Sequence, residues 1–146
     1  MLKEKLMEDL KNAMKNKDEV RKSTITLIKA AILQVEKDTQ KQLDDAAIIE
    51  IIAKEAKKRK DSLEDYVKSG REDLISQINS EIAVIKEYLP EELSLEELTK
   101  IVEETISEVG AVSMKDMGKV MQAVKAKTTG RADGKTINEI VKKLLG

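Results

Sequence analysis

The spacing of apolar residues constrains this chain more than any other feature of its sequence. Apolar side chains recur every three or four residues almost throughout, and no segment alternates between apolar and polar residues as a half-buried strand does. Two such stripes are Leu2, Leu6, Leu10 and Met14, and then Ile25, Ile28, Ile32 and Val35. The pattern predicts an all-α fold built from amphipathic helices.

Residues that cap or break helices divide this pattern into seven expected helices. Ser94 with Glu97 forms a capping box, and Gly70 and Gly110 are suited to end helices. Asp18 and Asp44 are suited to start helices, as are Ser113 and Asp133. The first five expected helices span about 2–15, 18–37, 45–67, 72–89 and 95–109, and two more follow Ser113 and Asp133.

Pro90, the only proline, separates two expected parts of the chain. Proline lacks an amide donor and biases the preceding residue away from helical dihedrals, so the fourth helix should end at Leu89. We therefore expect an N-terminal four-helix domain over residues 1–90. A small three-helix bundle should follow over residues 91–146, near the lower size limit for independent stability.

The chain contains no histidine and no cysteine. Their absence removes the usual imidazole base, the thiol nucleophile and the commonest transition-metal ligands. A Ser-His-Asp or Cys-His arrangement cannot be built, and no pattern marks a carboxylate or a lysine as catalytic. The paired acids between Glu91 and Glu104 match no metal cage. We expect no catalytic residue, no cofactor and no metal site.

Neither export nor membrane insertion is indicated. No apolar run approaches the roughly 20 residues that a membrane-spanning helix needs. The start of the chain, MLKEKLMEDLK, lacks the apolar core of a signal peptide. By elimination, we expect a cytoplasmic protein.

Charge is balanced overall but unevenly distributed. The net charge is −1, residues 1–90 are neutral, residues 91–110 carry −6 and residues 111–146 carry +5. The only aromatic residues are two tyrosines, whereas recognition of unstacked bases uses aromatic platforms. Any contact with nucleic acid should therefore be made to phosphates and to overall shape.

The most basic turn is KAKTTGRADGK, residues 125–135. Capping explains much of it, because Gly130 suits a left-handed C-cap and Asp133 an N-cap. The cations exceed what capping requires, so phosphate contact is the alternative, although Asp133 would oppose an anion. The candidate nucleic-acid-binding residues are Lys119, Lys125, Lys127, Arg131 and Lys135.

Three other features have a simpler structural explanation. Gly118 lies inside an expected helix, which favours the close approach of a neighbouring helix over a functional role. The basic run Lys54–Lys60 fits the solvated face of its helix. The methionines of the sixth helix fit core packing, with an adaptable partner groove as the alternative.

Several segments together resemble the GatB/YqeY family. They are IKAAILQVEKD (28–38), EIAVIKEYLPEELSLEEL (81–98) and MKDMGKVMQAVKAKTTGRADGKTINEIVKKLL (114–145). Their order and spacing match across nearly the entire chain. The chain is similar to stand-alone YqeY-like proteins, and through them to the C-terminal tail domain of the GatB component of the aspartyl/glutamyl-tRNA amidotransferase.

The resemblance implies an all-helical, two-part protein with a tendency to bind tRNA. It does not imply catalysis, because the amidase component and the ATP-using part of the large enzyme have no counterpart here. We therefore expect a weak RNA-binding accessory module. The alternatives are an adaptor that docks to an amidotransferase or an aminoacyl-tRNA synthetase, and carbon–nitrogen ligation with glutamine as amido donor, the latter only within a larger complex.

Overall fold

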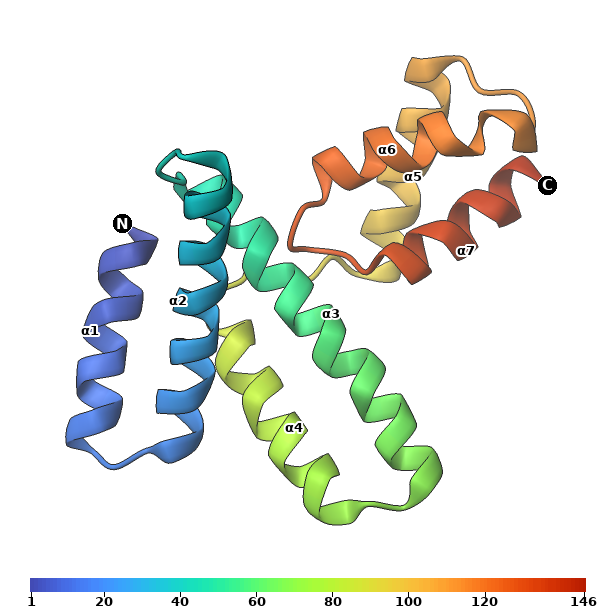
Figure 1. The fold of residues 1–146 in the computed structure, drawn as a ribbon. Coiled ribbons are helices and arrows are strands. Elements are labelled where there is room, and N and C mark those ends of the chain that lie inside the picture. The colour runs from blue at the N-terminus through green and yellow to red at the C-terminus, as the bar shows by residue number, and fades with distance from the viewer. The chain divides into compact units, whose positions relative to one another are not determined.

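The computed structural model describes residues 1–146 and confirms the all-α fold, with no strand (Figure 1). The helices are α1 (Leu2–Lys15), α2 (Glu19–Thr39), α3 (Asp45–Ser69), α4 (Glu72–Lys86), α5 (Leu95–Val109), the short 3₁₀ helix η1 (Met114–Asp116), α6 (Met117–Lys127) and α7 (Gly134–Leu145). No helix is long and apolar enough to cross a membrane.

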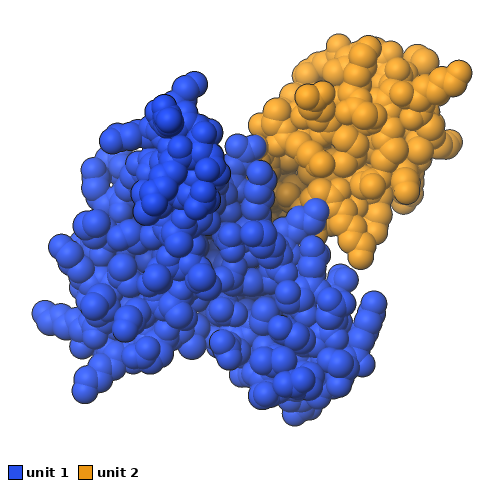
Figure 2. Space-filling view, viewed as in Figure 1, with its two compact units in different colours: residues 1–89 blue, residues 90–146 orange.

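Two compact units make up the chain, unit 1 (residues 1–89) and unit 2 (residues 90–146), and Figure 2 colours them separately. The division expected from Pro90 differs from this one by a single residue. Each unit has a buried apolar cluster of its own.

Unit 1 is organised around α2, which packs against α1, α3 and α4. The wide apolar stripe of α2 predicts contact with more than one neighbour, and this is confirmed. Two helical hairpins are visible in Figure 1, α1 with α2 and α3 with α4. The buried cluster comprises Leu6, Ile25, Ile28, Ile32, Ile48, Ile52, Ala56, Val84, Ile85 and Tyr88.

The basic run Lys54–Lys60 is only partly a solvated face. Most of its lysines are exposed, but Arg59 retains only 8% of its surface. Arg59 lies seven residues after Ile52, so it falls on the buried stripe of α3. Its Nη1 donates to Glu55 Oε2 at 2.9 Å, and its Nε lies 3.9 Å from Glu81 Oε1 on α4. The expectation that the whole run is solvated is therefore wrong at this position.

The fourth helix ends earlier than expected, at Lys86 rather than Leu89. The next three amides bond to carbonyls three residues back, which tightens the chain into turns before Pro90. The side chain of Tyr88 is buried, and its hydroxyl donates to Asp9 on α1. We infer that this tertiary contact, added to the restriction from Pro90, ends the helix.

Unit 2 contains α5, α6 and α7, each packed against the other two. Its buried cluster is Leu98, Val102, Val120, Val124, Ile137, Ile140 and Val141. Met117 and Met121 pack against that cluster as partly buried side chains, as core packing of the methionines predicts. Met114 does not, because 42% of its surface is exposed. The sixth expected helix is split, because Ser113 caps the 3₁₀ turn η1 and α6 begins only at Met117.

Gly118 does not mark a close helix approach. It is exposed on α6, and a Cβ atom at this position would meet nothing within 4 Å. The expected neighbour is missing because Met117 and Val120 carry the inward face of α6, while Gly118 lies on the outward face. The packing explanation for this glycine is therefore wrong.

Candidate nucleic-acid interface

Charge is separated between the helices of unit 2. The acids of residues 91–110 lie on α5 and the segment before it, whereas the cations lie on α6, α7 and the turns beside them. Lys125 and Lys127 occupy the last turn of α6, where cations complement the helix dipole. Lys135 lies in the first turn of α7, after the N-cap Asp133.

Lys127 is committed to a contact within unit 2. Its Nζ lies 2.6 Å from Glu108 Oε2 and donates to Thr105 Oγ1 at 3.0 Å, so it joins α6 to α5. The buried Thr105 hydroxyl in turn donates to the carbonyl of Ile101 at 2.7 Å. Lys127 therefore satisfies both an acid and a buried hydroxyl of the neighbouring helix.

Arg131 also has a structural role. Its Nε donates to the carbonyl oxygen of Glu91 at 3.1 Å, and its own carbonyl accepts from the amide of Leu93 at 2.9 Å. Its amide donates to the Thr128 carbonyl at 2.8 Å. These bonds hold the α6–α7 turn against the segment that precedes α5. Gly130 adopts the expected left-handed φ of 77°, but it lies in the turn after α6, whose C-cap is Thr128. The prediction of a C-cap at Gly130 is therefore wrong.

Lys125 extends over the start of α7. Its Cε would lie 3.6 Å from a Cβ atom at Gly134, and its Nζ 3.9 Å from that point. Asp133 Oδ1 accepts from the Lys135 amide at 3.1 Å, so a carboxylate already occupies part of this helix start. The Lys125 side chain is exposed and forms no hydrogen bond or ion pair.

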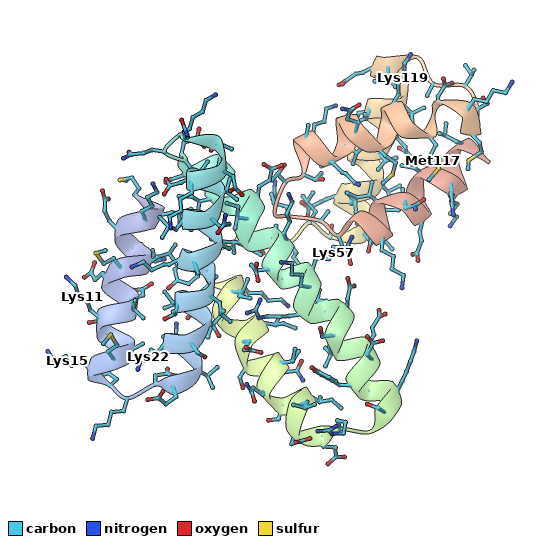
Figure 3. The ribbon with its side chains drawn as sticks, viewed as in Figure 1. Lys11, Lys15, Lys22, Lys57, Met117 and Lys119 are labelled. Carbon is cyan, nitrogen blue, oxygen red and sulfur yellow. The ribbon has the colours of Figure 1, made fainter.

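Lys119 lies at the opposite end of α6 from this turn (Figure 3). It is eight residues before Lys127, a separation of about 12 Å along a helix axis. Its side chain is exposed and unpaired. Lys125 and Lys127 themselves point to opposite sides of α6, toward α7 and α5 respectively. The five candidate cations therefore do not form one compact cluster.

Sequence reasoning did not anticipate these partners. The Lys127–Glu108 pair and the Arg131–Glu91 contact join positions 19 and 40 residues apart. Lys142 and Lys143 fall outside the predicted set of cations, yet both are exposed in the last turn of α7. The amphipathic pattern around Ile140 and Val141 was a signal that could have placed them on the surface.

Comparison with known proteins places the chain in a family. A family model described as "Yqey-like protein" matches residues 3–145. The chain belongs to the YqeY-like family.

Several curated relatives of this YqeY-like chain bear the name altered inheritance of mitochondria protein 41, mitochondrial. The one from Pyrenophora tritici-repentis is 30% identical over 97% of this chain and 80% of the relative. Those from Lachancea thermotolerans and Kluyveromyces lactis are 44% and 39% identical over 58% and 57% of this chain. The matches cover only 46% and 45% of those two relatives, so the chain spans about half their length.

These names contradict the expectation of a cytoplasmic protein, because each relative is named as mitochondrial. The expectation is wrong because it rested on elimination. Absence of an apolar signal core argues against one secretory route only. A chain without cysteine also gives no redox indication that would separate one compartment from another.

Proposed function

We propose that this YqeY-like chain is a non-catalytic accessory protein that binds tRNA or another structured RNA weakly through unit 2. The motifs that resemble the tail domain of the GatB component of the amidotransferase suggest this class of ligand. The near absence of aromatic side chains favours recognition of phosphates and shape over recognition of bases.

The observation that carries the proposal is the presence of two exposed lysines on α6 without partners. Lys119 and Lys125 form no ion pair or hydrogen bond, so phosphate contact would cost neither of them an existing interaction. Lys127 would have to leave Glu108, and Arg131 would have to leave the Glu91 carbonyl. We therefore assign the main phosphate contacts to Lys119 and Lys125. Lys127, Arg131 and Lys135 would contribute only to the positive electrostatic potential that attracts the RNA.

A salt titration of tRNA binding tests the proposal. We expect Lys119→Ala/Lys125→Ala to weaken binding and to reduce the slope of log K against log salt by up to about 2, because each lost phosphate contact accounts for roughly one. The measurement is fluorescence anisotropy of labelled tRNA between about 50 and 200 mM salt. This variant leaves the structural contacts of Lys127 and Arg131 intact.

The matched control is Lys54→Ala/Lys57→Ala. It removes the same charge from exposed positions of α3 in unit 1. If both double variants lose the same affinity, binding reflects net charge and not a site on unit 2. If neither changes the slope, the assignment to Lys119 and Lys125 fails.

The second candidate function is a protein-interaction adaptor that docks to an amidotransferase or an aminoacyl-tRNA synthetase. Half-exposed apolar side chains on unit 1, among them Met7 and Leu33, favour a protein partner. Co-purification of such an enzyme with a tagged copy, surviving nuclease and high salt, would support this function over RNA binding.

Glutamine-dependent amide transfer is the least supported alternative, and only as part of a larger complex. The sequence offers no nucleophile beside an activating base. We expect the purified chain alone to release no ammonia from glutamine, and turnover by the chain alone would overturn this ranking.

A further inference from the structure

A groove runs between α1 and α2 on unit 1. It encloses about 300 Å³. Its lining residues are Lys3, Leu6, Met7, Lys29, Ala30, Ile32, Leu33 and Glu36. Leu6 and Ile32 belong to the buried cluster of unit 1, so they close the floor of the groove.

Two large apolar side chains at this groove remain half exposed. Met7 keeps 49% of its surface and Leu33 keeps 51%. Burial of side chains of this size is worth about 1.5–3 kcal/mol each when complete, so their exposure leaves a substantial part of that free energy for a ligand. Methionine is also flexible and polarisable, which suits it to contact with a partner surface.

The apolar surface continues along α1 beyond the groove. Met14, with 56% of its surface exposed, lies seven residues after Met7 and therefore on the same stripe of the helix. Seven residues rise about 10 Å, or two helical turns. This length matches anchors at i, i+3 or i+4, and i+7 on a helix laid into the groove.

Unpaired cations border this stripe. Lys11 lies between Met7 and Met14 in the sequence of α1, and Lys22 and Lys29 share the stripe of Leu33 on α2. None of the three side chains forms an ion pair or hydrogen bond. Figure 3 shows Lys11 on the outer side of α1 and Lys22 on the neighbouring α2.

The one acid that lines the groove is already neutralised. Glu36 forms an ion pair with Lys3 and accepts a hydrogen bond from the Leu43 amide at 2.9 Å. The Lys3 ammonium, together with that amide, lowers the pKa of the Glu36 carboxyl. Glu4 and Glu8 project further round α1, roughly 60° and 100° from Met7. On α2, Glu19 lies two heptads before Leu33 and is exposed. With three unpaired lysines, the border of the apolar stripe is therefore positive on balance.

We propose that the α1–α2 groove binds an amphipathic helix of a protein partner, one whose apolar anchors are flanked by acidic residues. The apolar anchors would fill the space beside Met7 and Leu33, and the acids would face Lys11, Lys22 and Lys29. RNA would gain nothing from an apolar floor, and a lipid surface does not fit into a concave groove. This inference is independent of RNA binding by unit 2.

A displayed library tests the proposal on the intact chain. Each library member is a helix of about 18 residues with fixed apolar anchors and with Glu, Gln or Lys at every flanking position. We expect the protein to enrich members with Glu at the flanks. Leu33→Glu should weaken binding of the selected peptides by about tenfold or more, because a charge would then replace an apolar side chain that the anchors contact.

Leu27→Glu is the matched control, since Leu27 lies on the same helix with the same 51% exposure but does not line the groove. The Leu27→Glu variant should bind the selected peptides with an affinity within about twofold of that of the unsubstituted protein. Circular dichroism and thermal melting will show that both variants fold.

Three outcomes would overturn the proposal: no enrichment, enrichment without acidic flanks, or equal losses in the two variants. Binding of tRNA or of vesicles containing phosphatidylserine that depends on Leu33, with no peptide selected, would also overturn it. Such a result would assign the face to that other ligand.

Discussion

Tyr88 combines burial with a specific hydrogen bond at the end of α4. Desolvation, and then the hydrogen bond to the Asp9 carboxylate, raise the pKa of its phenol above the ordinary value of 10.0. The Lys5 ammonium lies 5.4 Å from the centre of its ring. The neutral phenol is therefore the form that the folded protein favours.

This pKa shift predicts a loss of stability in alkali. Above pH 10 the unfolded chain ionises Tyr88 while the folded chain does not, so the free energy of unfolding falls as pH rises. Tyr88→Phe lacks this effect, and its stability deficit relative to the natural protein should shrink between about pH 9 and pH 11. Urea unfolding at both pH values measures this difference in the free energy of unfolding, and Tyr66→Phe is the control. A stability deficit of Tyr88→Phe that stays constant with pH would contradict the raised pKa of Tyr88.

At this scale the sequence predicted residue types and exposure better than partners. Asp133 caps α7 and Lys125 is exposed, as local rules indicate, because those rules involve only a few neighbouring residues. Gly130 has the expected left-handed φ but lies two residues beyond Thr128, the C-cap of α6. The bond from Lys127 to Thr105 depends on how α6 lies against α5, which no local rule contains. Individual contacts at the candidate interface could therefore not be read from the sequence.

The pairing of α3 with α4 includes an ionic contact as well as apolar ones. The side chain of Arg59 is 10% exposed, and those of its acidic partners Glu55 and Glu81 are 15% and 14% exposed. Removal of the Arg59 guanidinium would leave the largely buried carboxylates of Glu55 and Glu81 without this positive charge.

We expect Arg59→Ala to lower the free energy of unfolding by about 3–5 kcal/mol, the usual cost of removing one partner of a buried ion pair. Lys58→Ala is the comparison, because its side chain is 74% exposed and it pairs with the same Glu55 at 3.4 Å. That variant should lose no more than about 1 kcal/mol. Urea unfolding at neutral pH measures both, and similar losses would show that Arg59 is not the buried partner described here.

Helix identity was predictable, because periodicity and capping are encoded over short stretches. The starts of α3 and α5 follow Asp44 and Ser94, and the end of α3 at Gly70 has the expected left-handed conformation. Ser94 Oγ accepts from the Glu97 amide at 3.1 Å, which is one half of the predicted capping box. The other half is not formed, because Glu97 Oε1 accepts from the Ser94 hydroxyl at 3.0 Å and not from the Ser94 amide. The end of α4 was missed because the Tyr88 contact with α1 is tertiary.

On the scale of the whole chain, units 1 and 2 bury separate apolar clusters. Ile52 is completely buried in the first and Ile137 is 1% exposed in the second. This arrangement suggests that each cluster stabilises mainly its own unit.

Matched Ile→Val substitutions test that independence. Ile52→Val and Ile137→Val should each cost about 0.5–1.5 kcal/mol. We expect amide hydrogen exchange, followed by mass spectrometry, to accelerate in residues 1–89 for the first variant and in residues 90–146 for the second. Equal acceleration throughout the chain in either variant would show instead that the two units unfold together.

Gly118 gives unit 2 an unexpected property. A glycine in a helix interior costs about 1 kcal/mol relative to alanine, and Gly118, as the second residue of α6, bears part of that cost. No neighbouring atom requires the missing methyl group. Alanine at this single exposed position would therefore raise the free energy of unfolding of unit 2. The bare backbone there also offers an incoming molecule a closer approach to α6 than any side chain would permit.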